Sequence, residues 1–152
     1  MQLKQVLETD VNELADLVVE YHEFEGIQSD RERNARVLMP LLSGDSSHGR
    51  VWFIRNNDIN IGYVAITFCY SIEFGGRESF IDEIFIRSSE RGKGLGRKAL
   101  TRVVEELISQ DFKAIHLEVD INNLVAKSLY KDMGFKQREK YDALTFLVEQ
   151  AQ

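Results

Sequence analysis

Apolar and polar positions alternate along this chain with two different periods, and the changes of period divide it into strands and helices. Alternation with period two, or a short continuous apolar run, predicts seven strands, at residues 2–7, 51–55, 59–71, 78–86, 114–119, 135–141 and 144–148. Apolar side chains three and four residues apart predict helices at 11–25, 30–42, 97–108 and 124–133. The order predicts an α/β fold of the mixed α+β type, one central mixed sheet of about seven strands flanked by about four helices.

Local signals sharpen the helix boundaries. Asp10 with Glu13, and Ser29 with Glu32, have the spacing of helix capping pairs. Asn122 or Asn123 is placed to cap the last helix. The strand 59–71 is long and mostly apolar, as expected of a central strand that is covered on both faces.

Composition narrows the class of protein. A chain of 152 residues fits one domain, 1–152, with 43% hydrophobic and 29% charged residues. The net charge of -6 argues against a general nucleic-acid binder. The single cysteine, Cys69, leaves no disulfide framework, and the longest apolar run is too short to span a bilayer. We therefore expect a cytoplasmic protein with no membrane and no nucleic-acid partner.

One glycine-rich stretch follows the strand 78–86 and opens onto the helix 97–108. It reads Arg91-Gly92-Lys93-Gly94-Leu95-Gly96 and continues into Arg97. Glycines expose backbone N–H groups, and a helix N-terminus adds unpaired N–H groups and a positive dipole. Six of the 19 Lys and Arg residues lie between positions 87 and 102. These features together favour binding of a phosphate or pyrophosphate.

Two other glycine motifs fit this stretch less well. A P-loop needs Ser or Thr after its Gly-Lys pair, and here Gly94 follows Lys93. A dinucleotide fingerprint matches Gly94, Gly96 and Ala99, with an acidic residue about twenty positions later. In that motif, however, the first glycine follows its strand directly, whereas here residues 87–91 intervene.

A second motif lies further along the chain, and the two motifs together indicate a protein family. Its residues are Asn123, Ala126, Leu129, Tyr130, Gly134 and Phe135. Together with the loop at 91–96, which matches the pattern Q/R-x-x-G-x-G/A, they resemble the GCN5-related N-acetyltransferases, or GNAT superfamily. The resemblance covers nearly the whole chain and is weakest over residues 20–50.

The resemblance implies that acetyl-CoA is the co-substrate and that no metal is needed. Its pyrophosphate would bind the amides from Gly92 to Arg97, and its pantetheine arm would pair like an extra strand with Ile84, Phe85 and Ile86. In this family the strand after the loop's helix, here 114–119, splays away and frees those backbone groups.

Two residues of the second motif receive roles by the same resemblance. Tyr130 would protonate the departing thiolate as a general acid, and Asn123 would contact the cofactor. The alternative interpretation is that Tyr130 is a core aromatic residue that packs against Leu129 and Met133. The alternative interpretation of Asn123 is a helix N-cap, and this role is compatible with cofactor contact.

An acidic pair on the strand 78–86 is the candidate acceptor site. On a regular strand Asp82 and Glu83 point to opposite faces, and Glu83 shares its face with Ile81 and Phe85. A partly desolvated Glu83 suits a general base, and a structural acid paired with a nearby arginine, such as Arg77 or Arg87, is the alternative. The strand is similar to that of the family's polyamine acetyltransferases, in which an acidic pair binds a cationic acceptor. Glu23, Glu25 and Glu73 would extend an acidic cleft.

The three histidines, His22, His48 and His116, have no ligand spacing and do not predict a metal site. The predicted function is transfer of an acetyl group from acetyl-CoA to a primary amine, by direct attack in a ternary complex. A polyamine or other small-molecule amine is the favoured substrate. The alternatives are a protein or peptide N-acetyltransferase and a non-catalytic acyl-CoA sensor on the same fold. Homodimers are common in the family that the chain resembles, so a homodimer is a further expectation.

Overall fold

The computed structural model describes residues 1–148 of the chain. The chain divides into two compact units, Met1–Glu118 and Val119–Gln152, of which the second is described as far as Val148. Each unit is considered by itself. None of the helices in the described part of the chain is long and apolar enough to cross a membrane.

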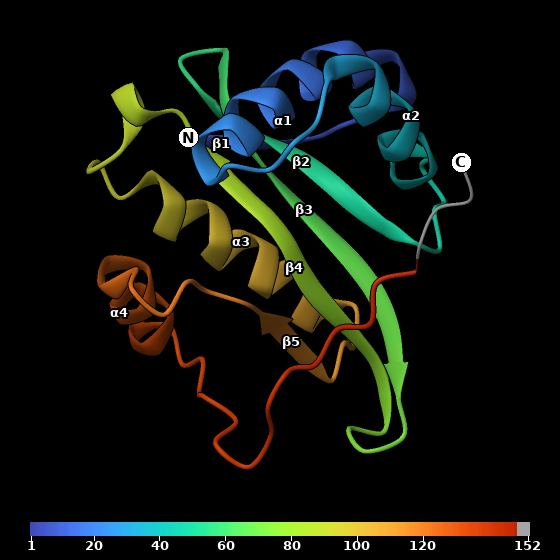
Figure 1. The fold of residues 1–152 in the computed structure, drawn as a ribbon, viewed down its shortest axis with the longest axis vertical. Coiled ribbons are helices and arrows are strands. Elements are labelled where there is room, and N and C mark those ends of the chain that lie inside the picture. The colour runs from blue at the N-terminus through green and yellow to red at the C-terminus, as the bar shows by residue number, and fades with distance from the viewer. Residues whose placement is uncertain (149–152) are drawn as a thin grey trace. The chain divides into compact units, whose positions relative to one another are not determined.

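The first unit is built on one five-stranded sheet in the order β1-β2-β3-β4-β5 (Figure 1). Its strands are β1 (Gln2–Gln5), β2 (Gly49–Asn56), β3 (Ile59–Ser71), β4 (Gly76–Ile86) and β5 (Ala114–Leu117). The first four pair antiparallel, whereas β5 pairs parallel with β4. The parallel pair requires a crossover, and the chain makes it through a helix. The sheet is therefore mixed, as the order of elements in the sequence predicts.

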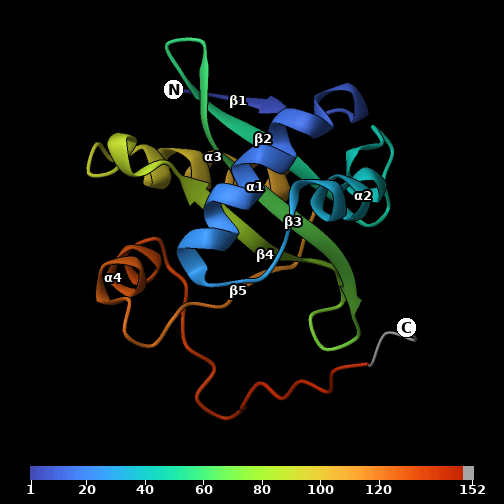
Figure 2. The same ribbon diagram turned by 45° about the horizontal axis from the view of Figure 1, so that its top comes forward.

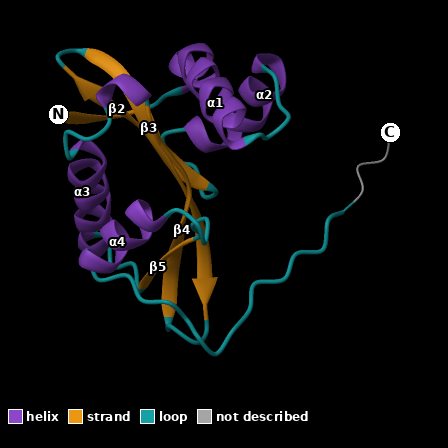
Figure 3. Ribbon diagram, turned by 60° about the vertical axis from the view of Figure 1, so that its left-hand side comes forward, coloured by secondary structure: helices purple, strands orange, loops and turns teal. Residues whose placement is uncertain are grey.

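Helices cover both faces of this sheet. The helices α1 (Val11–Glu25) and α2 (Arg31–Leu42) lie on one face, and α3 (Leu95–Ser109) lies on the other (Figure 3). Figure 2 shows α1 crossing over the strands. One core cluster joins α1 and α2 to inward-facing residues of the sheet, among them Phe53, Tyr63 and Phe85. Burial of these side chains is the main stabilising contribution to this face.

The ends of α1 and α2 differ in detail from the predicted caps. Asp10 makes no side-chain cap for α1, and instead its carboxylate accepts from the Leu7 N–H at 3.1 Å. Asp30, rather than Ser29, caps α2 by accepting from the Arg33 N–H at 2.8 Å. Ser29 is thereby left to bond elsewhere. Gly26 ends α1 in the left-handed region, at φ 70°.

The second unit contains α4 (Leu124–Asp132). Asn123 caps this helix, since its side chain accepts from the Ala126 N–H at 3.1 Å. The ring of Tyr130 meets the ring of Phe135 edge-on, with centroids 5.9 Å apart. The sequence motif that runs from Asn123 to Phe135 is therefore one capped helix and the turn that follows it.

The predicted closing hairpin at 135–141 and 144–148 is wrong. Residues 1–148 contain five strands, not seven, and neither segment of the hairpin is a strand. Positions 136–140 are all polar, so the first segment has no apolar face to bury. The second segment is apolar, but Leu144 and Phe146 are 93% and 90% exposed. Alternation alone was a poor guide here because a strand also needs a partner and a surface to cover.

Candidate functional site

The ladder between β4 and β5 ends halfway along β4. β5 pairs with β4 only from Glu78 to Ile81, whereas β3 pairs with β4 as far as Ile86. Over the remaining residues of β4, from Asp82 to Ile86, one edge has no strand beside it within residues 1–148. β5 ends at Leu117, two residues before the predicted end of the strand at 119, and the edge of β4 beyond Ile81 is left open, as the resemblance implies.

The direction of the exposed backbone groups follows from the ladder on the other side. The Arg87 N–H donates to the Ile61 carbonyl of β3 at 2.9 Å. Backbone groups alternate along a strand, so Ile86 and Ile84 direct theirs away from β3, toward the open edge. The guanidinium of Arg91 donates to the Ile86 carbonyl at 2.7 Å. Ile84 thus offers its backbone groups at an edge where β5 no longer pairs with β4.

A β-bulge at Asp82 lies where the ladder ends. Ala65 of β3 pairs with Glu83 and the adjacent Ile66 pairs with Ile81, so Asp82 is the extra residue on β4. Directly paired residues share a face, and neighbours on a strand do not. Glu83 therefore shares its face with Phe85, as expected, but not with Ile81. The prediction for Ile81 failed because regular alternation does not continue through a bulge.

Glu83 is held at both oxygens. The phenol of Tyr63 donates to Oε2 at 2.6 Å, and His22 Nε2 lies 2.6 Å from Oε1. The predicted alternatives for a partner were arginines, and both are engaged elsewhere: Arg87 forms an ion pair with Glu20, and Arg77 lies over the ring of Phe112. Burial, and then the charge of Glu83, raises the pKa of Tyr63 far above its usual value. Tyr63 therefore remains protonated and continues to donate.

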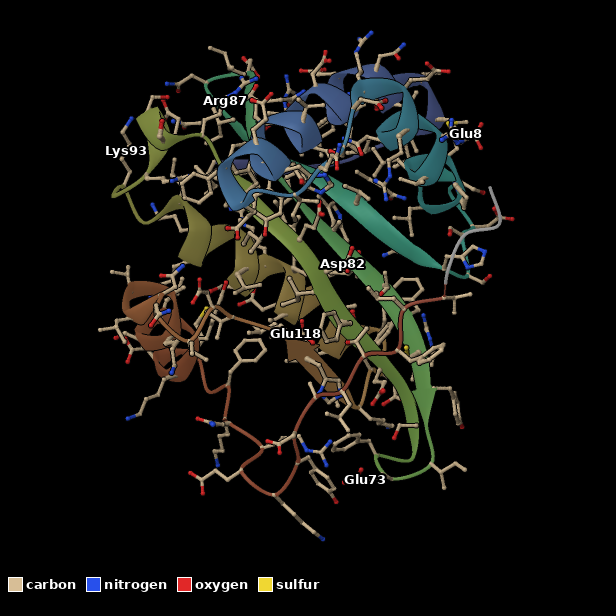
Figure 4. All side chains as sticks on the ribbon, in the orientation of Figure 1. Glu8, Glu73, Asp82, Arg87, Lys93 and Glu118 are labelled. Carbon is tan, nitrogen blue, oxygen red and sulfur yellow. The ribbon has the colours of Figure 1, made fainter. Side chains whose placement is uncertain are left out.

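Asp82 and Glu118 join Glu83 in one acidic group, in which the charges of Glu83 and Glu118 both act on Asp82. Asp82 is on β4, and Glu118 directly follows β5 (Figure 4). Burial raises the pKa of Asp82, and the charges of Glu83 and Glu118 raise it further. A cation placed beside such a carboxyl group stabilises its ionised form. Glu73, by contrast, lies in the turn at the distal end of the β3–β4 hairpin, so it does not extend this acidic group.

The glycine loop has the backbone conformation that an anion site needs. Gly92 and Gly94 have φ values of 76° and 72°, in the left-handed region that side chains disfavour. A Cβ atom at either position would meet nothing within 4 Å, so conformation rather than space calls for glycine. α3 begins at Leu95, two residues earlier than predicted, with Gly94 as an N-cap that provides no side-chain bond. The loop therefore presents the start of a helix without a capping side chain.

Charged side chains of the loop are partly neutralised or packed. Lys93, labelled in Figure 4, lies 3.1 Å from Glu90. The guanidinium of Arg91 lies over the ring of Phe24 at 4.6 Å, in addition to its bond to the Ile86 carbonyl. Arg97 falls in the first turn of α3. The first unit thus brings together all the predicted residues from Asp82 to Ile86 and from Arg91 to Arg97.

Asn123 and Tyr130 both belong to the second unit. Burial raises the pKa of Tyr130, so its hydroxyl is protonated at neutral pH. Within residues 1–148, no group of three or more His, Cys, Asp or Glu side chains is arranged to hold a metal ion.

Sequence reasoning missed His22, Tyr63 and Ser29. His22 bonds to Glu83 across 61 positions, a pairing that no local pattern reveals. The available signal was a histidine on the apolar stripe of the first helix, which in a folded chain must find polar partners.

Comparisons with known proteins bear on this arrangement. Residues 11–135 match the Acetyltransferase (GNAT) family. Bovine thialysine N-epsilon-acetyltransferase is 31% identical over 74 residues, which cover 49% of this chain and 43% of the bovine protein. The match thus spans less than half the length of that relative.

Solved structures share the fold. An integron cassette protein from the mobile metagenome of Cole Harbour Salt Marsh is 29% identical, with a TM-score of 0.80 over 99% of this chain and 90% of that one. A predicted acetyltransferase from Clostridium acetobutylicum, solved with acetyl-CoA, is 20% identical, with a TM-score of 0.76 over 95% of both chains. The second likeness concerns the fold alone.

Proposed function

Because this chain belongs to the Acetyltransferase (GNAT) family, we propose that it transfers an acetyl group from acetyl-CoA to a primary amine. The observation that carries the proposal is the open edge of β4 from Asp82 to Ile86, with the glycine loop following that strand. An unpaired strand edge and a bare helix N-terminus suit a ligand that has both an amide-bearing arm and a pyrophosphate. The structure solved with acetyl-CoA has the same fold, which is consistent with this ligand.

Residues of the first unit would hold the co-substrate in two places. The amides from Gly92 to Arg97 would bind the pyrophosphate, with Arg91 and Lys93 adding positive charge. The backbone of Ile84 and Ile86 would pair with the pantetheine arm, because their N–H groups face the open edge. Phe85, also expected to pair with the arm, directs its backbone groups to β3 and would contribute only its side chain. When bound, acetyl-CoA supplies a thioester whose acetyl group is transferred to the amine.

Glu83 is the proposed general base. An acceptor amine arrives as an ammonium ion and must lose a proton before its nitrogen can attack. In this step an N–H bond breaks, an O–H bond forms at a Glu83 oxygen, and the nitrogen regains its electron pair. Tyr63 and His22 hold the carboxylate by one contact at each oxygen, so it cannot rotate away.

Tyr130 and Asn123 are assigned by the sequence motif alone. Tyr130 keeps its proton at neutral pH and can therefore give it to the departing thiolate. Asn123 caps α4 through its side-chain oxygen, which leaves its amide nitrogen for the co-substrate. Tyr130→Phe is expected to lower kcat about 10- to 100-fold and to change the affinity for acetyl-CoA less. Steady-state kinetics and calorimetry together measure both quantities, and an unchanged kcat would remove the acid role.

A cationic small amine, such as a polyamine, is the favoured acceptor. The charges of Glu83 and Glu118 both act on Asp82, so the three carboxylates form one negative group, and a nearby cation would favour the ionised form of Asp82. The name of the bovine relative specifies an N-epsilon amine, which is also a primary amine on a short aliphatic chain. The acidic group would attract such a substrate and orient it.

Release of free thiol from acetyl-CoA across an amine panel tests the proposal. Polyamines, lysine analogues, aminoglycosides and peptides with a free N-terminus are compared at equal concentration. Preferred turnover of a small diamine or polyamine supports the assignment, and preferred turnover of peptides would indicate a protein N-acetyltransferase. Micromolar CoA binding without turnover of any amine would favour a non-catalytic sensor. Light scattering on the same sample tests the expected homodimer.

A further inference from the structure

His22 is the most completely bonded polar side chain near the proposed base. It lies in the last turn of α1 and is only 6% exposed, although neighbouring Glu23 is exposed to solvent. Its Nε2 lies 2.6 Å from Glu83 Oε1, and its Nδ1 lies 2.6 Å from Ser29 Oγ. The ring therefore links β4 to the connection between α1 and α2.

The bonds beyond Ser29 favour one assignment of the proton on the ring. Arg33 Nη1 donates to Asn34 Oδ1 at 3.1 Å, which turns the amide nitrogen of Asn34 toward Ser29. That nitrogen donates to Ser29 Oγ at 3.1 Å. With its oxygen already accepting, Ser29 is free to donate its own hydrogen to His22 Nδ1. Asn34 is completely buried, so this orientation is fixed by the fold.

The other end of the ring agrees with this assignment. An ionised carboxylate can only accept, so His22 must donate to Glu83 from Nε2. A neutral ring protonated at Nε2 satisfies both contacts, whereas a neutral ring protonated at Nδ1 would set a lone pair against a carboxylate oxygen. Tyr63, 0% exposed, donates to the second oxygen. Glu83 is thus clamped by a donor from α1 and a donor from β3.

We propose that His22 is a positioning residue for the acetyl transfer: its Nε2–H, set by Ser29 and Asn34, holds Glu83 oriented and ionised so that Glu83 can accept the proton of the amine. The inference rests on the proposed function, because it assigns His22 to the same proton-transfer step. His22 itself does not touch the substrate in this scheme. Another hydrogen-bond donor at the position of Nε2 could replace His22, whereas the proton acceptor Glu83 could not be replaced in this way.

The chain offers a matched control in its other histidine–glutamate pair. His116 of β5 lies 3.1 Å from Glu78, also on β4, but in the half of that strand that is paired on both sides. Leu and Gln substitutions at His22 and His116 therefore make the same chemical change in two places. Glutamine keeps an N–H donor near the position of Nε2, whereas leucine removes it.

The kinetic experiment compares these four variants with the best amine found for the wild-type chain. His22→Leu should lower kcat/KM for the amine about 30-fold and leave the KM for acetyl-CoA unchanged. His22→Gln should stay within about threefold of wild type, and both His116 variants should be as active as wild type. A folded His22→Leu variant with wild-type kcat/KM would overturn the inference. So would equal losses in His22→Gln and His22→Leu, because the donor would then be irrelevant.

The pH profile adds a readout that a merely structural role would not change. His22→Leu removes a hydrogen bond to the carboxylate of Glu83, so the acid limb of kcat/KM should move to higher pH in this variant. The titratable groups around His22 and Glu83 are Asp82 on β4, Tyr63 on β3, which donates to Glu83, and Tyr21, whose ring lies 5.9 Å from that of His22. On the α2 side Ser29 and Asn34 do not titrate, and the charged Arg33 donates to Asn34. An acid limb that does not move would count against the inference.

Nuclear magnetic resonance of the ¹⁵N-labelled ring tests the inference without any substrate. The wild-type protein should show His22 protonated at Nε2 with Nδ1 unprotonated near neutral pH, and the opposite tautomer would overturn the inference. If the wild-type chain turns over no amine, the proposed function fails while this measurement still decides the bonding. Should His22→Leu not fold, Ser29→Ala serves instead, with an expected loss of about fivefold in kcat/KM. No loss there would contradict the inference.

Discussion

The two halves of β4 have the same strand conformation and different surroundings. From Glu78 to Ile81 the strand is paired with β3 on one side and β5 on the other. From Asp82 to Ile86 it is paired with β3 alone, after a bulge at Asp82. The paired half contributes Ser79 and Ile81 to the interior, and the open half carries Asp82, Glu83 and the unpaired edge. In this molecule the candidate chemistry begins where the ladder ends.

One strand can therefore serve two purposes: its doubly paired half stabilises the sheet, and its singly paired half leaves an edge to which a ligand can bind. An unpaired edge inside a protein is costly unless something bonds to it, and this edge is followed by a loop suited to a phosphate. A variant in one half of β4 can therefore be compared with a matched variant in the other half or in a neighbouring turn.

Proline substitutions should separate the halves most strongly. Phe80→Pro removes an N–H group from a strand paired on both sides and should lower the free energy of unfolding by about 3 kcal/mol or more. Ile84→Pro removes an N–H group that faces the open edge, so the chain should fold and lose affinity for acetyl-CoA. Thermal unfolding and calorimetry measure the two effects. Equal destabilisation by both variants would mean that the edge at Ile84 is not open.

The two glutamates of β4 should differ in activity rather than in stability. Glu83→Gln removes the proposed base and should lower kcat/KM for the amine about 100-fold, the usual contribution of a positioned base. Glu78→Gln changes only the pair with His116 and should leave kcat/KM within about twofold of wild type. Steady-state rates with the preferred amine measure both. Similar activity of the two variants would show that Glu83 is not the base.

Two glycines with a left-handed backbone conformation lie beyond the two ends of β4. Gly92 follows the open half and Gly75 precedes the paired half, each with φ of 76° and nothing within 4 Å of an added Cβ. Alanine at either position should therefore lower the free energy of unfolding by about 1 kcal/mol. Only Gly92→Ala should also weaken acetyl-CoA binding, by about tenfold, because it shifts the backbone of the loop. Calorimetry that showed equal affinity for both variants would argue against the loop as the phosphate site.

Alkaline pH should give the smallest effect. The folded state raises the pKa of Tyr63, so above pH 10 the unfolded chain loses a proton that the native chain keeps. Stability present at neutral pH is then lost as pH rises, by about 0.8 kcal/mol at pH 10.5 for an unfolded pKa near 10. Tyr63→Phe should remove this part of the slope in urea titrations. An unchanged slope would mean that another group is responsible.

The fold, the left-handed glycines of the loop and the helix cap could be predicted because their signals are local. The strand at Ile59–Ser71, the glycine loop and the Asn123 cap each depend on neighbouring residues, and the structure agrees with them. The open edge of β4 beyond Ile81 was expected from the family resemblance. These features need no knowledge of distant contacts.

The acceptor half could not be predicted in the same way. The clamp on Glu83 depends on His22 and Tyr63, which lie 61 and 20 positions away. The bulge at Asp82 shifts the alternation, so residues of β4 before it point to the opposite face from the one that regular alternation predicts. No residue type in the sequence indicates such a bulge. The hairpin at 135–148 was predicted from alternation without knowing whether a partner strand existed.

Hydrogen exchange of single backbone amides, with and without acetyl-CoA, tests the central claim most directly. In the free protein the Ile84 amide should exchange rapidly and the Phe80 amide slowly, because only the second is in the doubly paired half. Saturating acetyl-CoA should slow exchange at Ile84 and leave Phe80 as it was. If acetyl-CoA binds while the Ile84 amide exchanges at its original rate, the open edge of β4 is not the binding edge, and the account is contradicted.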